Sequence, residues 1–444
     1  MRRFFTLLVV SVAVASCVST PPGEAVTTSS SSTSLATTAP ATTAPPSTTT
    51  TLDPQTLHEQ AILTQINELI ARTEQIRELD FLAEPTVTLV DDDELANRVR
   101  QLIDEDIDPD EIARDTALEE LLGLIPEGTD LLALYQDLYG EQVLGFYDGE
   151  TKELVVPSNE DELSPAQKAT LVHELTHALT DQHFGFSDEA DALDEAQRFD
   201  RLSALQAVTE GDATLTELHY VAALATGEQQ EVIAGSLNQD TSVFDAAPRF
   251  IQDLLVFPYN AGFTLLNGLW SASTGFDRIN EAYVDPPTTT EQVIHPDKYA
   301  AREPAVAVSL PDTPLDGYET VEESVWGELI FEVMFRQELG EDVADAAAAG
   351  WGGDQYRLLW NGENVAFALL YAGDSETDAI EMREALGDYV TADMAVSRTR
   401  NDGSGIALTG DTYAFVSRVA DRVLFIAADD PAIGAELRSY FPDF

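Results

Sequence analysis

The chain has 444 residues, of which 44% are hydrophobic and 8% aromatic, enough to bury one large core or two medium ones. Acidic residues number 80 against 23 basic residues, and the formal net charge of -57 argues against a polyanionic partner. These values exclude a peptide hormone, a disulfide-rich miniprotein and a nucleic-acid-binding protein. Solubility or adaptation to salt explains the acidic excess, with selection for a cationic substrate as the alternative.

The N-terminal segment predicts export. Two arginines precede an apolar run, residues 4–15, which is too short to span a bilayer and is typical of a signal peptide. The run ends in Ala-Ser-Cys17, which resembles the lipobox of bacterial lipoproteins and implies that Cys17 is lipidated. We expect residues 1–17 to be a signal peptide with lipobox; ordinary secretory cleavage is the alternative. The protein would then be lipid-anchored in the cell envelope, outside the cytoplasmic membrane, or secreted.

Residues 18–54 are Thr, Ser, Pro and Ala with almost no large apolar side chain, which predicts a disordered tether. Ordered structure is expected from residue 55. The periodicity of apolar residues predicts a helix, a strand and acidic amphipathic segments, over residues 57–79, 84–90 and 91–138 respectively.

The middle of the chain predicts a β-hairpin followed by long helices. Apolar arms flank Asp148-Gly149 within residues 145–157, which is a hairpin signal. Ser164 is the expected N-cap of the next helix, with Gln167 completing a capping box and Gly185 ending the helix after His183. A second helix is expected over residues 188–225, with mostly helical sequence to residue 280 and a Pro-rich stretch over residues 286–314.

The C-terminal part has its own pattern. A helix is expected over residues 321–349, followed by two strands, a helix, two more strands and a last helix. This ββα-ββα order predicts a small α+β unit, residues 321–444, with a weak internal repeat. The expected bounds of these six elements are residues 356–360, 365–371, 375–386, 412–419, 423–427 and 431–440.

A His-Glu-Leu-Thr-His sequence, residues 173–177, is the strongest chemical signal in the chain. Residues four apart lie on one face of a helix, so His173 and His177 can bind one Zn²⁺ ion. Glu174 is then placed to act as general base toward a water on the metal. We expect a zinc site at this helix.

Three residues are candidates for the third zinc ligand. His183 stands ten residues after His173, as in metzincin peptidases, but no helix-breaking glycine lets it return to the metal. Glu210 lies on the next helix among small residues and is the favoured ligand, with Glu217 in reserve. Asp181 and Asp212 are expected either to orient a ligand histidine or to face solvent.

The segment His-Glu-Leu-Thr-His-Ala-Leu-Thr-Asp, residues 173–181, resembles the metal-binding helix of thermolysin-like gluzincin peptidases. The sequence Glu-Gly-Asp-Ala, residues 210–213, is similar to the glutamate helix of related bacterial envelope proteins, as are residues 257–262 and 286–296 to their other motifs. The close likeness covers about residues 145–214. Thr214 stands where thermolysin-type enzymes have an Asp, which argues against thermolysin itself as the parent.

The resemblance implies an α+β protein, with a mainly helical zincin-like core in residues 55–320 that carries a β-hairpin and edge strand before the metal helix. It implies zinc-dependent hydrolysis of a peptide or protein substrate, with Glu174 as base and a further side chain stabilising the oxyanion. His295 ranks first for that role; the others are His219, Tyr259 and Tyr147. Residues 153–156 are the expected edge strand for an extended substrate.

We therefore expect an envelope-tethered zinc endopeptidase with ligands His173, His177 and Glu210. One alternative is a degenerate, zinc-retaining lipoprotein that presents its C-terminal unit to a partner. The other is a metzincin-type protease with His183 as third ligand.

Overall fold

The structure is a computed structural model that describes residues 53–106, 108–141, 145–160, 162–273, 275–392, 399–401 and 406–444. The expected signal peptide, the lipidation of Cys17 and the tether up to residue 52 lie outside these ranges. None of the helices within them is both long enough and apolar enough to cross a membrane.

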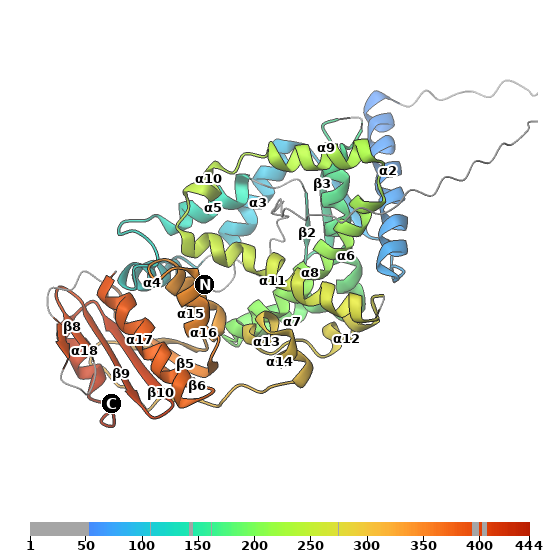
Figure 1. Ribbon diagram of the computed structural model, residues 1–444. Helices are drawn as coiled ribbons and strands as arrows, with labels where there is room; N and C mark the ends of the chain where they lie inside the picture. The colour runs from blue at the N-terminus through green and yellow to red at the C-terminus, as the bar shows by residue number, and fades with distance from the viewer. Residues whose placement is uncertain are drawn as a thin grey trace, which may run out of the picture.

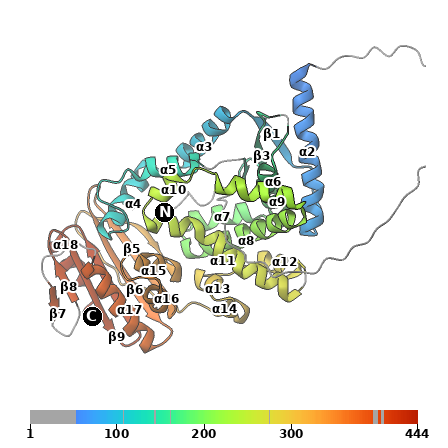
Figure 2. The same cartoon turned by 45° about the horizontal axis from the view of Figure 1, so that its top comes forward.

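The chain is an α+β protein, with helices filling the part before residue 319 and a large antiparallel sheet at the C-terminal end (Figure 1). Helix α2 lies at the end of the molecule remote from that sheet (Figure 2). The helices before the sheet are α2 (Pro54–Arg77), α3 (Asp92–Asp106), α4 (Pro109–Leu121), α5 (Leu131–Glu141), α6 (Pro165–Phe184), α7 (Phe186–Glu195), α8 (Phe199–Ala223), α9 (Thr226–Leu237), α10 (Ser242–Ala246), α11 (Arg249–Ser273), α12 (Asp277–Val284), α13 (Thr290–Ile294) and α14 (Pro296–Ala301).

Helices α7 and α8 replace the single helix expected over residues 188–225. Gln197 between them adopts the left-handed conformation, with φ 55°, so the helix cannot continue through it. The interruption lets α8 turn back and pack against α6, α7 and α11.

A three-stranded sheet precedes helix α6. It consists of β1 (Thr86–Val90), β2 (Phe146–Asp148) and β3 (Glu153–Pro157), in the order β1-β3-β2. The predicted hairpin at Asp148-Gly149 is confirmed by the antiparallel pairing of β2 and β3. The prediction that residues 153–156 form an edge strand is wrong, because β1 joins β3 in parallel on its other side. Of these two arms, β2 is the one at the edge.

The C-terminal sheet has the order β4-β5-β6-β10-β9-β8-β7, and every neighbouring pair is antiparallel. The two predicted strand pairs and their helices are confirmed as β5–β6 with α17 and β9–β10 with α18, but two strands that were not predicted, β7 and β8, lie between α17 and β9. The bounds are β4 (Glu319–Ser324), α15 (Gly327–Arg336), α16 (Glu341–Ala348), β5 (Trp351–Trp360), β6 (Val365–Gly373), α17 (Glu376–Ala392), β7 (Thr399–Asn401), β8 (Ile406–Thr409), β9 (Tyr413–Val419), β10 (Arg422–Ala428) and α18 (Pro431–Arg438).

The prediction of a single helix over residues 321–349 is wrong: the first residues form a strand, and the rest form two shorter helices. Residues 319–324 pair with β5 as strand β4, and Gly327 and Gly340, with φ of 74° and 78°, limit the helix that follows. Helices α15 and α16 result.

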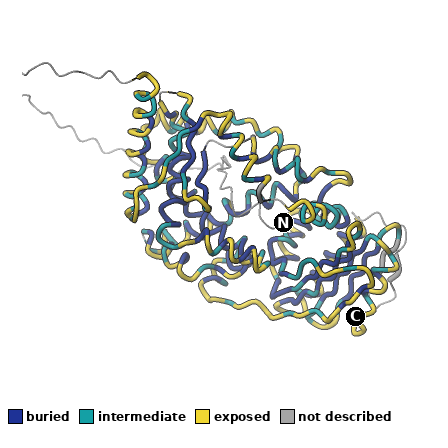
Figure 3. The backbone as a smooth tube through the Cα atoms, turned by 180° about the vertical axis from the view of Figure 1, so that it is seen from behind, coloured by how far each residue is buried: buried dark blue, intermediate teal, exposed yellow. Residues whose placement is uncertain are grey.

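The two faces of the sheet carry different helices. Val423 and Phe425 of β10 belong to a core that includes Met382 of α17, whereas Leu424 packs on the other face with Leu437 of α18. The first of these cores extends into α3, α8 and α11, and Figure 3 shows buried residues inside both the helical part and the sheet. The sheet and the helical region thus share one core.

Candidate metal centre

Helix α6 begins and ends as its sequence predicts. The Ser164 hydroxyl accepts a hydrogen bond from the Gln167 N–H, and the Gln167 side chain accepts one from the Ser164 N–H. Gly185, with φ 65°, ends the helix in the left-handed conformation. Between these ends every residue from 169 to 181 is buried, so the histidines lie inside the protein.

Helices α6 and α8 bring the three expected ligands together. His173 and His177 occupy one face of α6, and their ring centroids are 4.8 Å apart. The Glu210 Oε2 atom lies 3.1 Å from His173 Nε2 and 3.6 Å from His177 Nε2. One donor atom from each of the three residues lies within 4.8 Å of the others, and all three residues are buried. This group could hold a metal ion.

The donor set suits zinc. Two imidazoles and one carboxylate form the protein part of a catalytic zinc site. Both ring nitrogens of buried His177 are without a hydrogen-bond partner, an arrangement that is costly unless something else binds them. A metal ion at Nε2 would remove part of that cost.

The charges of the group are strongly coupled. Burial opposes ionisation of Glu210, but His177 and His173 outweigh it and lower the pKa of Glu210 to about 2. Burial also disfavours the charged form of His173, yet the hydrogen bonds that its ring donates to Glu210 and Glu217 raise its pKa to about 10. Burial lowers the pKa of His177. A cation is therefore favoured here, either a proton on His173 or a metal ion.

Glu217 orients His173. Its Oε2 atom lies 3.3 Å from His173 Nδ1, so the Nε2 atom is the one that faces Glu210 and could bind a metal ion. The interpretation of Glu217 as a reserve ligand is thus corrected: it lies two turns after Glu210 on α8 and reaches the other nitrogen of the same ring.

The two aspartates considered for this orienting role have other partners. Asp181 accepts hydrogen bonds from Tyr147 Oη and Lys152 Nζ, each at 2.7 Å, and so ties α6 to the hairpin. Asp212 is fully buried and pairs with Arg77 Nε of α2 at 2.9 Å. Neither faces solvent, and neither hydrogen-bonds a ligand histidine.

Glu174 lies beside the metal group and is also fully buried. Its Oε2 atom accepts a hydrogen bond of 2.9 Å from the Tyr147 N–H of β2. Because β2 is the edge strand of the sheet as the described residues form it, this contact places the Glu174 carboxylate beside the edge of the three-stranded sheet.

Helix α11 brings Tyr259 to the group. It crosses α8 so closely that a Cβ atom on Gly262 would lie 1.9 Å from the Ala207 carbonyl oxygen. One turn earlier, the Tyr259 ring stacks on the His173 ring with centroids 6.2 Å apart, and the tyrosine hydrogen-bonds Glu210. Burial and the carboxylates of Glu210 and Glu174 raise the pKa of Tyr259, so its hydroxyl stays protonated and can donate.

The other predicted site residues lie elsewhere. His295 Nε2 is 2.8 Å from Glu328 Oε1 of α15. His183 hydrogen-bonds the Asp80 carbonyl oxygen through Nε2, at 2.8 Å, and is not part of the His-His-Glu group. His219 packs edge-on against Trp270, with ring centroids 4.7 Å apart. The Tyr147 hydroxyl is engaged by Asp181. Of the candidates for oxyanion donor, Tyr259 has the contact with the metal group.

From the sequence, His295 ranked above Tyr259 as the candidate oxyanion donor, although one sequence feature indicated Tyr259. Residues 257–262 combine an aromatic residue, a proline and a glycine within a helix, and that segment delivers both Tyr259 and the close helix crossing.

Comparison with known proteins adds one match. Residues 314–438 match the model of a domain of unknown function (DUF8575), a segment that contains the seven-stranded sheet and most of its helices. No curated protein matches the chain. No solved structure matches it either.

Proposed function

We propose that the protein is a zinc-dependent endopeptidase of gluzincin type, tethered to the cell envelope through Cys17. The observation that carries the proposal is the buried His173–His177–Glu210 group with Glu174 next to it. A site that only held zinc for structural reasons would need no general base beside the ligands.

The residues of the chain divide the chemistry among them. Zinc, when bound, supplies the Lewis acidity that polarises a scissile carbonyl and acidifies water. Glu174 is adjacent to the ligands and can take the proton from the attacking water and pass it to the leaving amine. Tyr259 can donate its hydroxyl proton in a hydrogen bond to the developing oxyanion.

The substrate would bind along β2. This strand is at the edge of its sheet, and its Tyr147 N–H already points toward Glu174. An extended peptide pairing with β2 would place its backbone next to the general base. Pairing with β2 replaces the pairing with residues 153–156 that the sequence suggested.

The test compares the full chain, purified in mild detergent, with its Glu174→Gln variant. We expect one zinc ion per chain in both proteins by elemental analysis, and casein hydrolysis only by the wild type. Glu231→Gln, a change of an exposed residue on α9, is the matched control and should keep both properties. Absence of zinc from metal-replete wild type would contradict the proposal, as would hydrolysis that survives Glu174→Gln.

One observation favours a second candidate, a zinc-retaining binding lipoprotein. The exposed fractions of His173, His177 and Glu210 are only 1%, 0% and 7%, and Glu174 is fully buried. In that case both proteins bind zinc and neither hydrolyses casein. The same experiment therefore separates the two candidates.

A further inference from the structure

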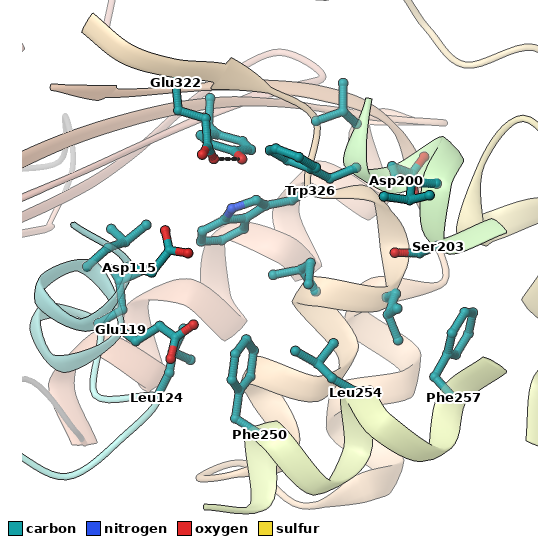
Figure 4. Close-up of a pocket in the computed structure, with 18 of the residues that line it drawn as sticks. Asp115, Glu119, Leu124, Asp200, Ser203, Phe250, Leu254, Phe257, Glu322 and Trp326 are labelled. Carbon is teal, nitrogen blue, oxygen red and sulfur yellow. Dashed lines mark hydrogen bonds between the residues drawn. The ribbon is translucent and has the colours of Figure 1, made fainter. Parts of the chain in front are cut away.

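A second site lies between the helical region and the C-terminal sheet. It is a cavity of about 70 Å³ (Figure 4), which offers room for about five non-hydrogen atoms. Helices α4, α8 and α11 of the helical region line it together with β4, α15 and β5 of the C-terminal region. Most of its wall is apolar and includes Leu118, Leu124, Phe250, Leu254 and Phe257.

The polar part of the wall is acidic. Asp115, Glu119, Asp200 and Glu322 line the cavity, and the described residues that line it include no Lys, Arg or His. Figure 4 shows Asp115 and Glu119 on one side of the cavity and Asp200 on the other. Among the described residues, the lining thus has four acidic side chains and no basic side chain to pair with them.

Glu119 is the residue that most needs a partner. It is 3% exposed, and its Oε2 atom has no hydrogen-bond partner. Asp200 is 4% exposed; its Oδ1 atom accepts hydrogen bonds from Thr290, whereas Oδ2 has no partner. Leaving a buried carboxylate oxygen without a donor is costly, so both oxygens favour a ligand that donates hydrogen bonds.

An aromatic face completes the cavity. The Trp326 indole lies across the cavity from the apolar side chains of α11 (Figure 4). The indole stacks on the Phe367 ring, with centroids 5.0 Å apart, and the backbone N–H of Trp326 donates a hydrogen bond to Asp354 Oδ1 at 3.0 Å. An indole face attracts organic cations.

We propose that this cavity binds a small organic cation, a primary ammonium group on a short aliphatic body, with Glu119 as its counter-ion. The ammonium group supplies the donors that Glu119 Oε2 and Asp200 Oδ2 lack, and the aliphatic body fills the apolar wall. A bare metal ion would not use that wall. Burial raises the pKa of Glu119 and of Asp200 to about 7, because ionising a buried carboxyl is unfavourable. A bound cation would offset the cost of ionising them.

The experiment is calorimetric titration of the full chain with n-butylamine and with butan-1-ol, its neutral counterpart of equal size. We expect saturable binding of the amine at one site, and binding of the alcohol at least about tenfold weaker because it cannot form an ion pair. Glu119→Gln should remove this preference. Glu127→Gln removes an exposed carboxylate after the same helix and should keep the preference.

Two results would overturn the proposal: equal binding of amine and alcohol, or no saturable binding of the amine. Unchanged amine binding in a folded Glu119→Gln variant would overturn it as well. Should that variant not fold, the comparison of the two probes on wild type still decides. Ser203→Leu, which places a larger side chain on the wall, should then reduce amine binding. None of these readouts depends on zinc or on hydrolysis.

An N-acetyl-lysine methylamide titration identifies the source of the cation. If it competes with n-butylamine, the cavity takes the lysine side chain of a peptide. If it does not compete, the cavity takes a free amine.

Discussion

Glu217 lies 3.3 Å from the Nδ1 atom of His173 and fixes which nitrogen of that ring faces the metal group. Glu217→Gln weakens this hydrogen bond and removes its charge, so we expect zinc affinity to fall about 10- to 100-fold. Competition with a chromogenic chelator measures the change. Glu231→Gln, on the exposed face of α9, should leave the affinity as it is. An unchanged affinity in Glu217→Gln would mean that Glu217 does not orient the ring.

Tyr259 tests the assignment of the oxyanion donor. Tyr259→Phe keeps the ring stacked on His173 and removes only the hydroxyl, so turnover should fall about 100-fold with zinc content unchanged. Steady-state hydrolysis of a fluorogenic peptide measures the effect. His295→Asn is the comparison variant. Because His295 pairs with Glu328 and not with the metal group, we expect this change to leave turnover unaltered. If turnover falls with His295→Asn and not with Tyr259→Phe, His295 is the donor.

At the residue scale, the sequence predicted the ligands better than their partners. His173, His177 and Glu210 follow from helical spacing and from the small residues around Glu210, which are local features. The orienting role of Glu217 and the position of Tyr259 depend on how α6, α8 and α11 are rotated against one another. That rotation is set by tertiary contacts such as the one at Gly262, which no local pattern encodes.

At the scale of elements, the crossing of α8 and α11 holds Tyr259 in place. A Cβ atom on Gly262 would lie 1.9 Å from the Ala207 carbonyl oxygen, so the helices must separate to admit it. We expect Gly262→Ala to lower the free energy of unfolding by about 1–3 kcal/mol and to lower turnover by moving Tyr259. Chemical denaturation and peptide hydrolysis measure the two effects.

Gly268 provides the matched control in the same helix. A Cβ atom there would meet nothing within 4 Å, so Gly268→Ala should raise the free energy of unfolding by about 0.5–1 kcal/mol. If both variants behave alike, the close crossing is not what positions α11.

Elements marked by caps and turns were predictable, and those that depend on a partner strand were not. The capping box at Ser164 and the hairpin at Asp148 carry their own signals. Residues 319–324 contain three glutamates and do not resemble a buried strand; they form one because β5 offers them an edge. Strand β3 likewise lies at the centre of its sheet, and not at the edge, because the distant strand β1 pairs with it.

For the whole molecule, buried carboxyls predict that stability falls as pH rises. Burial raises the pKa values of Glu119, Asp200, Glu291 and Glu332 to about 7, and that of Asp354 to about 6. Between about pH 4 and pH 7 the folded chain therefore binds more protons than the unfolded chain, so the free energy of unfolding decreases through this window. We expect Tm to be several degrees lower at pH 8 than at pH 5 by scanning calorimetry.

The chain offers a control for this pH dependence. Three lowered pKa values act in the opposite direction: that of Glu210 only as pH falls below about 4, outside the window, and those of His177 and His219 within it, where they offset part of the effect of the five carboxyls. Glu119→Gln should flatten the decrease, whereas Glu127→Gln should not. A Tm that rises from pH 5 to pH 8 would contradict the prediction.

The buried pairing of Arg77 with Asp212 joins residues that are far apart in the sequence, and this separation affects the order in which the chain folds. The guanidinium is fully buried, and its partners Asp212 and Asn280 follow 135 and 203 residues later in the chain. During synthesis Arg77 and both histidines of α6 are thus present long before the residues that enclose them. Closing such a long loop is entropically expensive and is slow compared with local helix formation. The contacts of Arg77 with α8 and α12 are consequently late products of folding, and a chain that ends before α12 lacks the partner Asn280.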